Sequence, residues 1–379
     1  MSPNDAAPGA GQSVAAPPAK QRNLAFDAFR GLAILFVVMA HSVGYGWDFI
    51  NHPTGQWNFY WSVFLRHVML CALPTFLFVS GYWLGGTEFH SRADYVNFLR
   101  KRVSRIVIPY VFWSVAFFVL YAFRARSFDK GLQPLVDLSV KLVLGQAEGP
   151  YFFIVMLLQF YLLTPLFVYA CKHTSVIKWI VATHILFVIA LYGVRYFYFK
   201  DLSFSYVKLP FLSWFPFYLM GVYLRRHPDH LVPKLNLGTR PHALTVPKLA
   251  VFTGLFLVLS VLEALILIRQ GYFEFGISDV KFTCFGYSVF ALLLMYQLRN
   301  AAWPRVLALL GDYAFGIFFI HGIILRAVMG KLRGVSFLFE FQPGYQFLAT
   351  FVTLAITCAI IYATRKVVGQ KLARDFLGF

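Results

Sequence analysis

Acidic side chains are scarce in this chain, and charged residues of any kind are few. Its 379 residues include 16 Asp and Glu against 34 Lys and Arg; charged residues make up 13% of the chain and apolar residues 59%. An average soluble domain carries about 25% charged residues, so a water-exposed surface is excluded for most of this chain. The net charge of +18 does not indicate a nucleic-acid partner, because the basic residues stand in short clusters between apolar segments.

Two further patterns are not found in the sequence: the spacing of metal ligands and, in residues 1–22, the apolar core of a cleavable signal. Cys71, Cys171, Cys284 and Cys358 lie in or at the ends of apolar segments and show no metal-ligand spacing, so we expect buried free thiols and no metal site. Residues 1–22 are rich in Ala, Pro and Gly and lack the apolar core of a cleavable signal. We expect them to form a disordered cytoplasmic tail.

Long apolar runs, by contrast, recur from Leu24 almost to the last residue. A helix that crosses the hydrocarbon core needs about 20 predominantly apolar residues. The sequence therefore predicts an all-α polytopic membrane protein of about ten transmembrane helices, with one membrane domain over residues 23–365 and a basic cytoplasmic tail over 366–379. The expected spans are 24–45, 59–84, 106–123, 151–171, 177–195, 209–224, 249–268, 282–298, 307–326 and 343–364.

The distribution of Lys and Arg predicts the orientation. Loops on the side of the N-terminal tail collect 20 of these residues and loops on the opposite side 11. Cytoplasmic loops carry the excess of basic residues, so both termini are expected in the cytoplasm.

The first span contains ionisable groups, which cost about 2.5–3.5 kcal/mol each to insert. Arg30 and His41 are eleven residues apart, which puts them within about 20° of one face and about 16 Å apart along the axis. Asp27 precedes Arg30 by three residues and can pair with it. The stripe has two interpretations: a functional pair, or two side chains that each reach toward the nearer interface.

A basic block follows the second span, in the stretch FLRKRVSRIVIPY. It contains Arg100, Lys101, Arg102 and Arg105. Arginine clusters suit the phosphates of a nucleotide or of CoA. The positive-inside bias also predicts basic residues at this position, so both explanations stay open.

Four other ionisable residues lie in or at the ends of spans. Arg66 is near the periplasmic end of the second span, and Glu263 is near the same end of the seventh, where each is either functional or interfacial. Asp312 opens the ninth span at its cytoplasmic end. His321 lies nine residues deeper and is either functional or a hydrogen-bonded core residue.

Several motifs resemble the acyltransferase-3 family of membrane-bound acyltransferases. The first motif is Asp27 followed by Arg30, with ten residues between Arg30 and His41. The other motifs, in the family's order, are FLFVSGYWLG, FLRKRVSRIVIPY, YFFIVMLLQFYLLTPLF, FPFYLMGVYL and GDYAFGIFFIH. Together they cover about residues 23–365. One departure concerns the fourth span, which in the family is often led by His-Leu-Trp; here Pro150 and Tyr151 stand in that place.

The resemblance implies an O-acyltransferase, most simply an O-acetyltransferase, of the bacterial inner membrane. The family includes O-acetyltransferases of exopolysaccharides, O-antigens and Nod factors, and glucan succinyltransferases. It implies acyl-CoA (acetyl-CoA) as the donor substrate with no tightly bound cofactor, a polysaccharide or lipid-linked glycan as acceptor, and an essential Arg30 and His41. The glycan, its acylated hydroxyl, the acyl group and the oligomeric state are left open.

Acyl transfer to a hydroxyl needs a base, a stabiliser for the oxyanion and a grip on the donor. His41 is the candidate base, or is transiently acylated and relays the group. Arg30, oriented by Asp27, is expected to bind a CoA phosphate or the thioester carbonyl, and Ser80 and Tyr82 are candidates for the route. The alternative is a secondary transporter or flippase for a lipid-linked sugar, because intramembrane charges also suit a translocation path.

Overall fold

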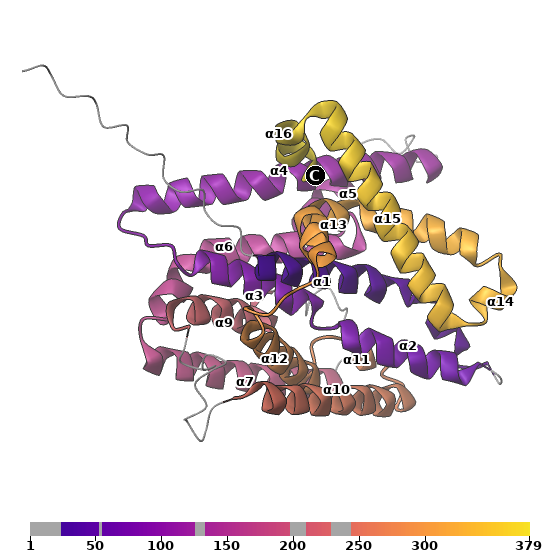
Figure 1. The fold of residues 1–379 in the computed structure, drawn as a ribbon, viewed down its shortest axis with the longest axis horizontal. Coiled ribbons are helices and arrows are strands. Elements are labelled where there is room, and N and C mark those ends of the chain that lie inside the picture. Colours follow the sequence, from indigo (N-terminus) through magenta and orange to yellow (C-terminus); the bar gives the residue numbers. More distant parts are fainter. Residues whose placement is uncertain (1–23, 53–54, 126–132, 198–209, 229–243) are drawn as a thin grey trace, which may run out of the picture.

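The computed structural model is a bundle of helices, with no strand in the residues that it describes. It describes all residues except 1–23, 53–54, 126–132, 198–209 and 229–243, so the expected N-terminal tail lies outside the described residues. The longer helices run roughly along one direction, as expected for membrane spans (Figure 1).

Among the described residues, eleven helices correspond to the ten expected spans, because the second span is in two pieces. They are α1 (Leu24–Ser42), α2 (Gln56–Met69) with α3 (Ala72–Leu84), α4 (Arg92–Ala125), α6 (Phe152–Ala170), α7 (Thr174–Phe197), α9 (Phe215–Arg226), α10 (Val246–Arg269), α12 (Phe282–Gln297), α13 (Arg305–Leu332) and α15 (Gln342–Val368). Within the described residues, eight spans are long and apolar enough to cross a membrane, α2 and α3 counting together. The other two, α9 and α12, have 12 and 16 residues.

Shorter elements connect these helices or lie at their ends. They are η1 (Gly44–Phe49), α5 (Gln133–Leu144), η2 (Gly149–Tyr151), η3 (Phe211–Ser213), α11 (Phe273–Gly276), α14 (Ser336–Phe339), α16 (Gln370–Leu372) and the π-helical turn η4 (Ala373–Leu377). The segment expected as a basic tail thus contains the end of α15, α16 and η4.

The second span is interrupted and not merely kinked. Helix α2 ends at Met69, and α3 begins at Ala72, so that Pro74 lies in the first turn of α3. Proline has no N–H, and its ring clashes with the carbonyl four residues earlier, which here belongs to Leu70, but it is tolerated in a first turn. The break therefore falls where the proline ring would otherwise disrupt a continuous helix.

Helix α1 is the centre of the bundle. It packs most extensively against α13 and also contacts α3, α15 and α2. At the α1–α13 crossing the backbones are so close that a Cβ on Gly31 would lie 1.8 Å from the carbonyl oxygen of Leu307, and a Cβ on Gly311 would lie 1.9 Å from that of Asp27. Small residues at membrane helix crossings permit this approach.

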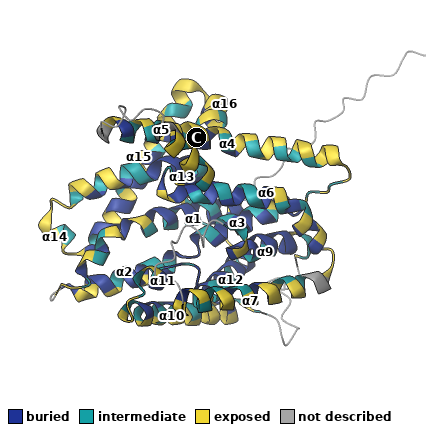
Figure 2. Ribbon diagram, turned by 180° about the vertical axis from the view of Figure 1, so that it is seen from behind, coloured by how far each residue is buried: buried dark blue, intermediate teal, exposed yellow. Residues whose placement is uncertain are grey.

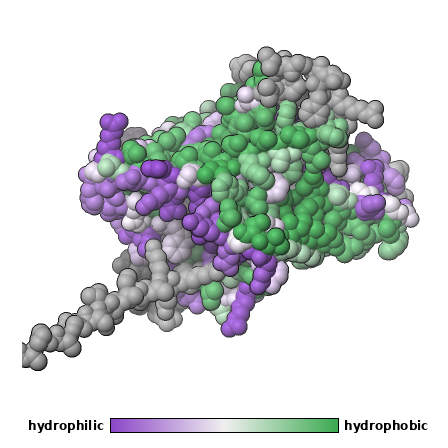
Figure 3. Space-filling model, turned by 90° about the horizontal axis from the view of Figure 1, so that it is seen from above, coloured by the Kyte–Doolittle hydropathy of each residue, from purple (hydrophilic) through white to green (hydrophobic). Residues whose placement is uncertain are grey.

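The outer helices present apolar side chains outward. Figure 2 shows buried residues concentrated on the central helices, whereas α4, α7 and α10 carry long exposed faces. On α10 the exposed residues include Val251, Leu255, Val258, Leu262 and Ile266. Figure 3 shows a broad apolar surface with polar regions on either side of it. An apolar surface of this extent is a lipid-facing surface.

The four cysteines are free thiols, as the sequence predicted. Cys71, Cys171 and Cys284 are buried, and Cys358 is half-buried.

Candidate active site

Helix α1 is accessible at two ends and closed between them. Arg30 is half-buried and His41 is exposed, whereas Ile34 and Val37, which lie between them on the same face, are 0% and 5% exposed. At 1.5 Å per residue the two polar groups are about 16 Å apart along the axis. The predicted stripe therefore consists of two separate polar regions, which we call the Arg30 end and the His41 end.

At the Arg30 end, the guanidinium pairs with the carboxylate of Asp27, as the sequence predicted. Arg30 Nη2 donates to Asp27 Oδ1, and the Asp27 side chain is buried while 39% of the Arg30 side chain is exposed. The buried carboxylate fixes the direction of the guanidinium and leaves part of it open to a ligand.

The basic block on α4 lies close to the same end. Arg105 is in electrostatic range of Arg102 and also of Arg30. The four side chains of the block, Arg100, Lys101, Arg102 and Arg105, are all exposed. The fold thus brings together two groups of residues that the sequence assigned to donor binding and that are about 70 positions apart.

Tyr82, at the end of α3, also lies at the Arg30 end. Its ring stacks on Phe26 of α1 with 4.2 Å between centroids, and the Arg225 guanidinium lies 5.4 Å from the centre of the same ring. Ser80, two residues earlier on α3, is half-buried. Tyr82 therefore borders the region that contains Arg30.

The loop between α3 and α4 places one carboxylate among these cations. Glu88 accepts hydrogen bonds from Arg226 at 2.8 Å and from Lys172 at 3.2 Å. These two bonds, first that of Arg226 and then that of Lys172, lower the pKa of Glu88 below its usual range. Glu88 thus compensates Arg226 and Lys172, two basic residues outside the α4 block.

At the His41 end, a second imidazole faces the first. The rings of His41 and His321 are 5.5 Å apart between centroids, at 40° to each other. His321 is fully buried, and its Nδ1 lies 2.9 Å from the carbonyl oxygens of Ile317 and Phe318. Carbonyls only accept, so Nδ1 carries the hydrogen and Nε2 has the lone pair. Among the described residues this buried Nε2 has no hydrogen-bond partner.

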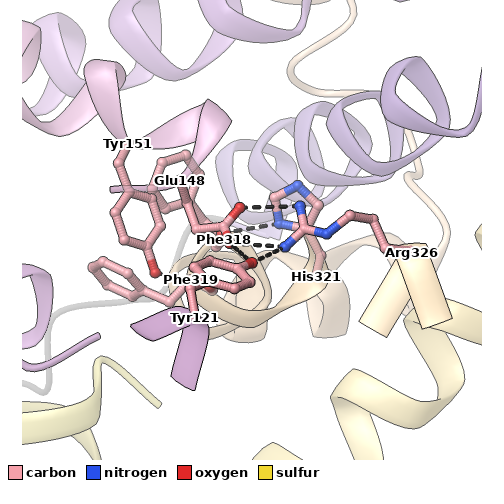
Figure 4. Close-up of polar contacts among 7 residues, drawn as sticks. All are labelled: Tyr121, Glu148, Tyr151, Phe318, Phe319, His321 and Arg326. Carbon is pink, nitrogen blue, oxygen red and sulfur yellow. Dashed lines mark hydrogen bonds and ion pairs between the residues drawn. The ribbon is translucent and has the colours of Figure 1, made fainter. Parts of the chain in front are cut away.

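An ion pair lies beside His321 (Figure 4). Arg326 Nη2 and Nη1 donate to the two carboxylate oxygens of Glu148 at 2.7 and 3.1 Å, and the Tyr121 hydroxyl bonds to both side chains. The Glu148 side chain is 6% exposed and that of Arg326 is 54% exposed. Both charges act on His321. A two-pronged pair of this kind fixes the position of both planar groups.

Sequence reasoning did not select Glu148, Arg326 or Tyr121. Glu148 lies outside the expected spans and Tyr121 is one of 21 tyrosines. The one available signal was that Arg326 is an ionisable residue within a span. Tyr151, which stands where the family often has its His-Leu-Trp stretch, is fully buried and donates to the Phe319 carbonyl oxygen at 2.9 Å.

Three other predicted residues are Asp312, Glu263 and Arg66, of which Asp312 directly follows Gly311 and so stands level with the Arg30 end of α1. Asp312 accepts a hydrogen bond of 2.7 Å from Arg365, which ties α13 to α15. Glu263 accepts a hydrogen bond from Thr283, which ties α10 to α12. Arg66 is half-buried on α2. The structure thus gives Asp312 and Glu263 contacts that join helices.

A buried lysine forms a further polar cluster in the α2–α10–α12 region. Lys281 is 1% exposed, and its Nζ lies 3.0 Å from His67 Nε2, 2.7 Å from the Gly276 carbonyl oxygen and 3.3 Å from that of Ser260. Three donors meet three acceptors, so the ammonium group is satisfied where it is buried. The cluster fastens α2, α10, α11 and α12 together.

Comparison with known proteins gives the same family that the sequence motifs resemble. The family model described as "Acyltransferase domain" (acyltransferase-3) matches residues 23–362. Two curated relatives are nodulation proteins NolL: that of Sinorhizobium fredii is 27% identical over 39% of this chain, and that of Mesorhizobium japonicum is 25% identical over 35%. These alignments span 37% and 32% of the relatives' own lengths. No solved structure matches. Because the family model matches nearly its whole length, the chain belongs to the acyltransferase-3 family of membrane acyltransferases.

Proposed function

We propose that this protein transfers an acyl group, most simply acetyl, from cytoplasmic acyl-CoA to a hydroxyl of a cell-envelope or exported glycan. The proposal includes an inner-membrane location with the Arg30 end facing the cytoplasm. The observation that carries the proposal is that α1 has an accessible polar group at each end. The Arg30 guanidinium lies near the α4 arginines, and the His41 imidazole faces that of His321.

The Arg30 end has the chemistry to hold the donor. Phosphates of CoA form charge-assisted hydrogen bonds with Arg102, Arg105 and the exposed part of Arg30. The pantetheine arm then extends from these phosphates toward the His41 end with the thioester at its tip. Ile34 and Val37 close this path in the structure, so the helices packed over them must separate when the donor binds.

The His41 end has the chemistry for the transfer. In one form, His41 removes the proton of the acceptor hydroxyl, whose oxygen attacks the thioester carbon; the C–S bond breaks, and the proton ends on the thiol of CoA. In the other form, His41 itself attacks the thioester carbon, the C–S bond breaks, and the thiol of CoA leaves with the ring proton of His41. The acceptor hydroxyl then attacks the acyl-imidazole, and its proton passes through Nε2 of His321 to the departing imidazole of His41. Glu148 and Arg326 offer an acceptor and donors to neighbouring sugar hydroxyls.

The test uses purified protein in lipid nanodiscs, radiolabelled acetyl-CoA and a glycan acceptor. The substitution His41→Ala is expected to lower transfer by at least about 10²-fold, the lower bound for loss of a general base. His90→Ala is the matched control, because His90 is exposed in the loop before α4, and its backbone N–H, which the substitution keeps, donates to Asp94. Full transfer by the His41 variant, or sugar transport without transfer by the unaltered protein, would contradict the proposal.

Omitting the acceptor separates the two forms of the mechanism. The relay form predicts radiolabel that stays bound to the protein and is absent from the His41→Ala variant. The base form predicts no protein-bound label in either.

A further inference from the structure

The chain returns to the bundle after α15. Gly369 has φ +86° and Gly378 has φ +72°, and between them α16 and η4 turn the backbone toward α4 (Figure 1). Positive φ values favour glycine, so the two residues permit the turns at each end of this segment. Residues 369–379 are therefore a docked element, which we call the return segment.

Apolar packing fixes the return segment. Trp113 of α4 donates its indole N–H to the Leu377 carbonyl oxygen at 3.0 Å, and its ring stacks on Phe379 with 5.6 Å between centroids. Phe379 is 3% exposed and Ala373 is fully buried. The Phe379 ring is buried against α4 and α13, and this packing fixes the end of the return segment on both helices. Gly316 of α13 leaves the space for the ring.

This docking brings Arg374 to the basic block. Arg374 lies on η4, which packs against α4, and its charge is within electrostatic range of Arg105. The Arg374 side chain is 55% exposed, and its Nε donates to Asp375 at 3.0 Å, a bond that leaves the two terminal nitrogens available to a ligand.

The cluster has more positive than negative charge. Arg30 is paired with Asp27 and Arg374 with Asp375, whereas neither Arg102 nor Arg105 has a carboxylate within 4.0 Å among the residues that the structure describes. Four guanidinium groups from three separate segments thus converge with two carboxylates. Such a surplus is costly without an anion, and the planar forks of arginine suit phosphate oxygens.

We propose that Arg374, held by the docked return segment, is a fourth phosphate-binding arginine of the donor site, together with Arg30, Arg102 and Arg105. The ligand class is a polyphosphorylated nucleotide such as the phosphoadenosine diphosphate part of CoA. The inference rests on the proposed function. Because Phe379 and Trp113 fix the segment beforehand, Arg374 loses little conformational freedom when the phosphate binds.

The experiment measures the affinity of free CoA for the full chain in zwitterionic nanodiscs, by isothermal titration calorimetry. Arg374→Ala is expected to weaken CoA binding about three- to tenfold, as for a half-exposed charge-assisted contact. Arg374→Lys is expected to retain part of the affinity. Lys371→Ala is the matched control, because Lys371 is an exposed cation three residues earlier in the same segment, and it is expected to leave the affinity within twofold.

Three results would overturn the inference. Arg374→Ala with unchanged CoA affinity removes the contact, and equal losses in the Arg374 and Lys371 variants reduce it to general surface charge. Unchanged CoA affinity with weaker association to phosphatidylglycerol nanodiscs assigns Arg374 to a lipid headgroup. In each case CoA still binds the unaltered protein, whereas absence of any CoA binding there refutes the proposed function itself.

Discussion

The α1–α13 crossing offers the sharpest test of the site's geometry, through Gly311→Ala. A Cβ on Gly311 would lie 1.9 Å from the carbonyl oxygen of Asp27, whereas ordinary contact begins at 3.4 Å. The 1.5 Å difference must come from moving one backbone relative to the other, because no side-chain rotation moves a carbonyl. The substitution therefore separates α1 from α13 beside the Asp27–Arg30 pair.

Two opposing terms set the effect on stability. Gly→Ala in a helix interior gains up to about 1 kcal/mol of helix propensity, and overpacking costs about 1–3 kcal/mol. Since the clash is with backbone, we expect the upper part of that cost and a net loss of about 1–2 kcal/mol. Activity should suffer more, because a misplacement of about 1 Å can cost about 10²-fold in rate, and α1 and α13 carry His41 and His321.

Gly330→Ala is the matched control on the same helix. A Cβ on Gly330 meets nothing within 4 Å, so this variant should keep full activity and be as stable as the unaltered protein or more so. Acyl transfer and thermal unfolding are measured for both variants in nanodiscs. If Gly311→Ala transfers at the unaltered rate, the closeness of α1 and α13 does not position the reacting groups, and the two-helix description of the site is wrong.

Two further predictions concern regions outside the site. Lys281→Met leaves His67 Nε2 and two buried carbonyl oxygens without their donor. It should therefore lower the free energy of unfolding by about 2–5 kcal/mol, without loss of CoA affinity in the folded fraction. An unchanged unfolding temperature would show that the cluster is not stabilising. Arg226 and Lys172 lower the pKa of Glu88 from the usual 4.5. The stabilisation from these contacts is present above pH 4.5 and is lost as the pH falls through the lowered folded-state pKa. The unfolding temperature of a Glu88→Gln variant should therefore fall less steeply as the pH is lowered, and identical pH profiles of the two proteins would refute this.

Much of the fold follows from the sequence, because a bilayer restricts the choices. Backbone groups in hydrocarbon must bond internally, so each long apolar run had to be a helix, and each expected span contains one. The second span is the exception in detail. One helix ends at Met69 and a new one starts at Ala72, because Pro74 then lies in a first turn, which accepts proline without loss of a bond.

The candidate site could be predicted only in its local part. Asp27 and Arg30 are three residues apart on one helix, and that spacing alone implies their pairing. Asp312 and Glu263 were singled out by the same intramembrane charge that marked Arg30, but their partners Arg365 and Thr283 lie on other helices. A charge in a span shows that a partner is needed and does not show which.

The sequence by itself thus determined the helices, the family motifs and the residues that one helix presents together. Tertiary structure alone decided that His41 meets His321, 280 positions later, and that Glu148 and Arg326 form a pair beside them. The physical reason is that helical periodicity specifies neighbours within about one turn, whereas contacts between helices depend on which faces pack and how closely. At the α1–α13 crossing that closeness is set by Gly31 and Gly311, two small residues whose effect appears only once both helices are in place.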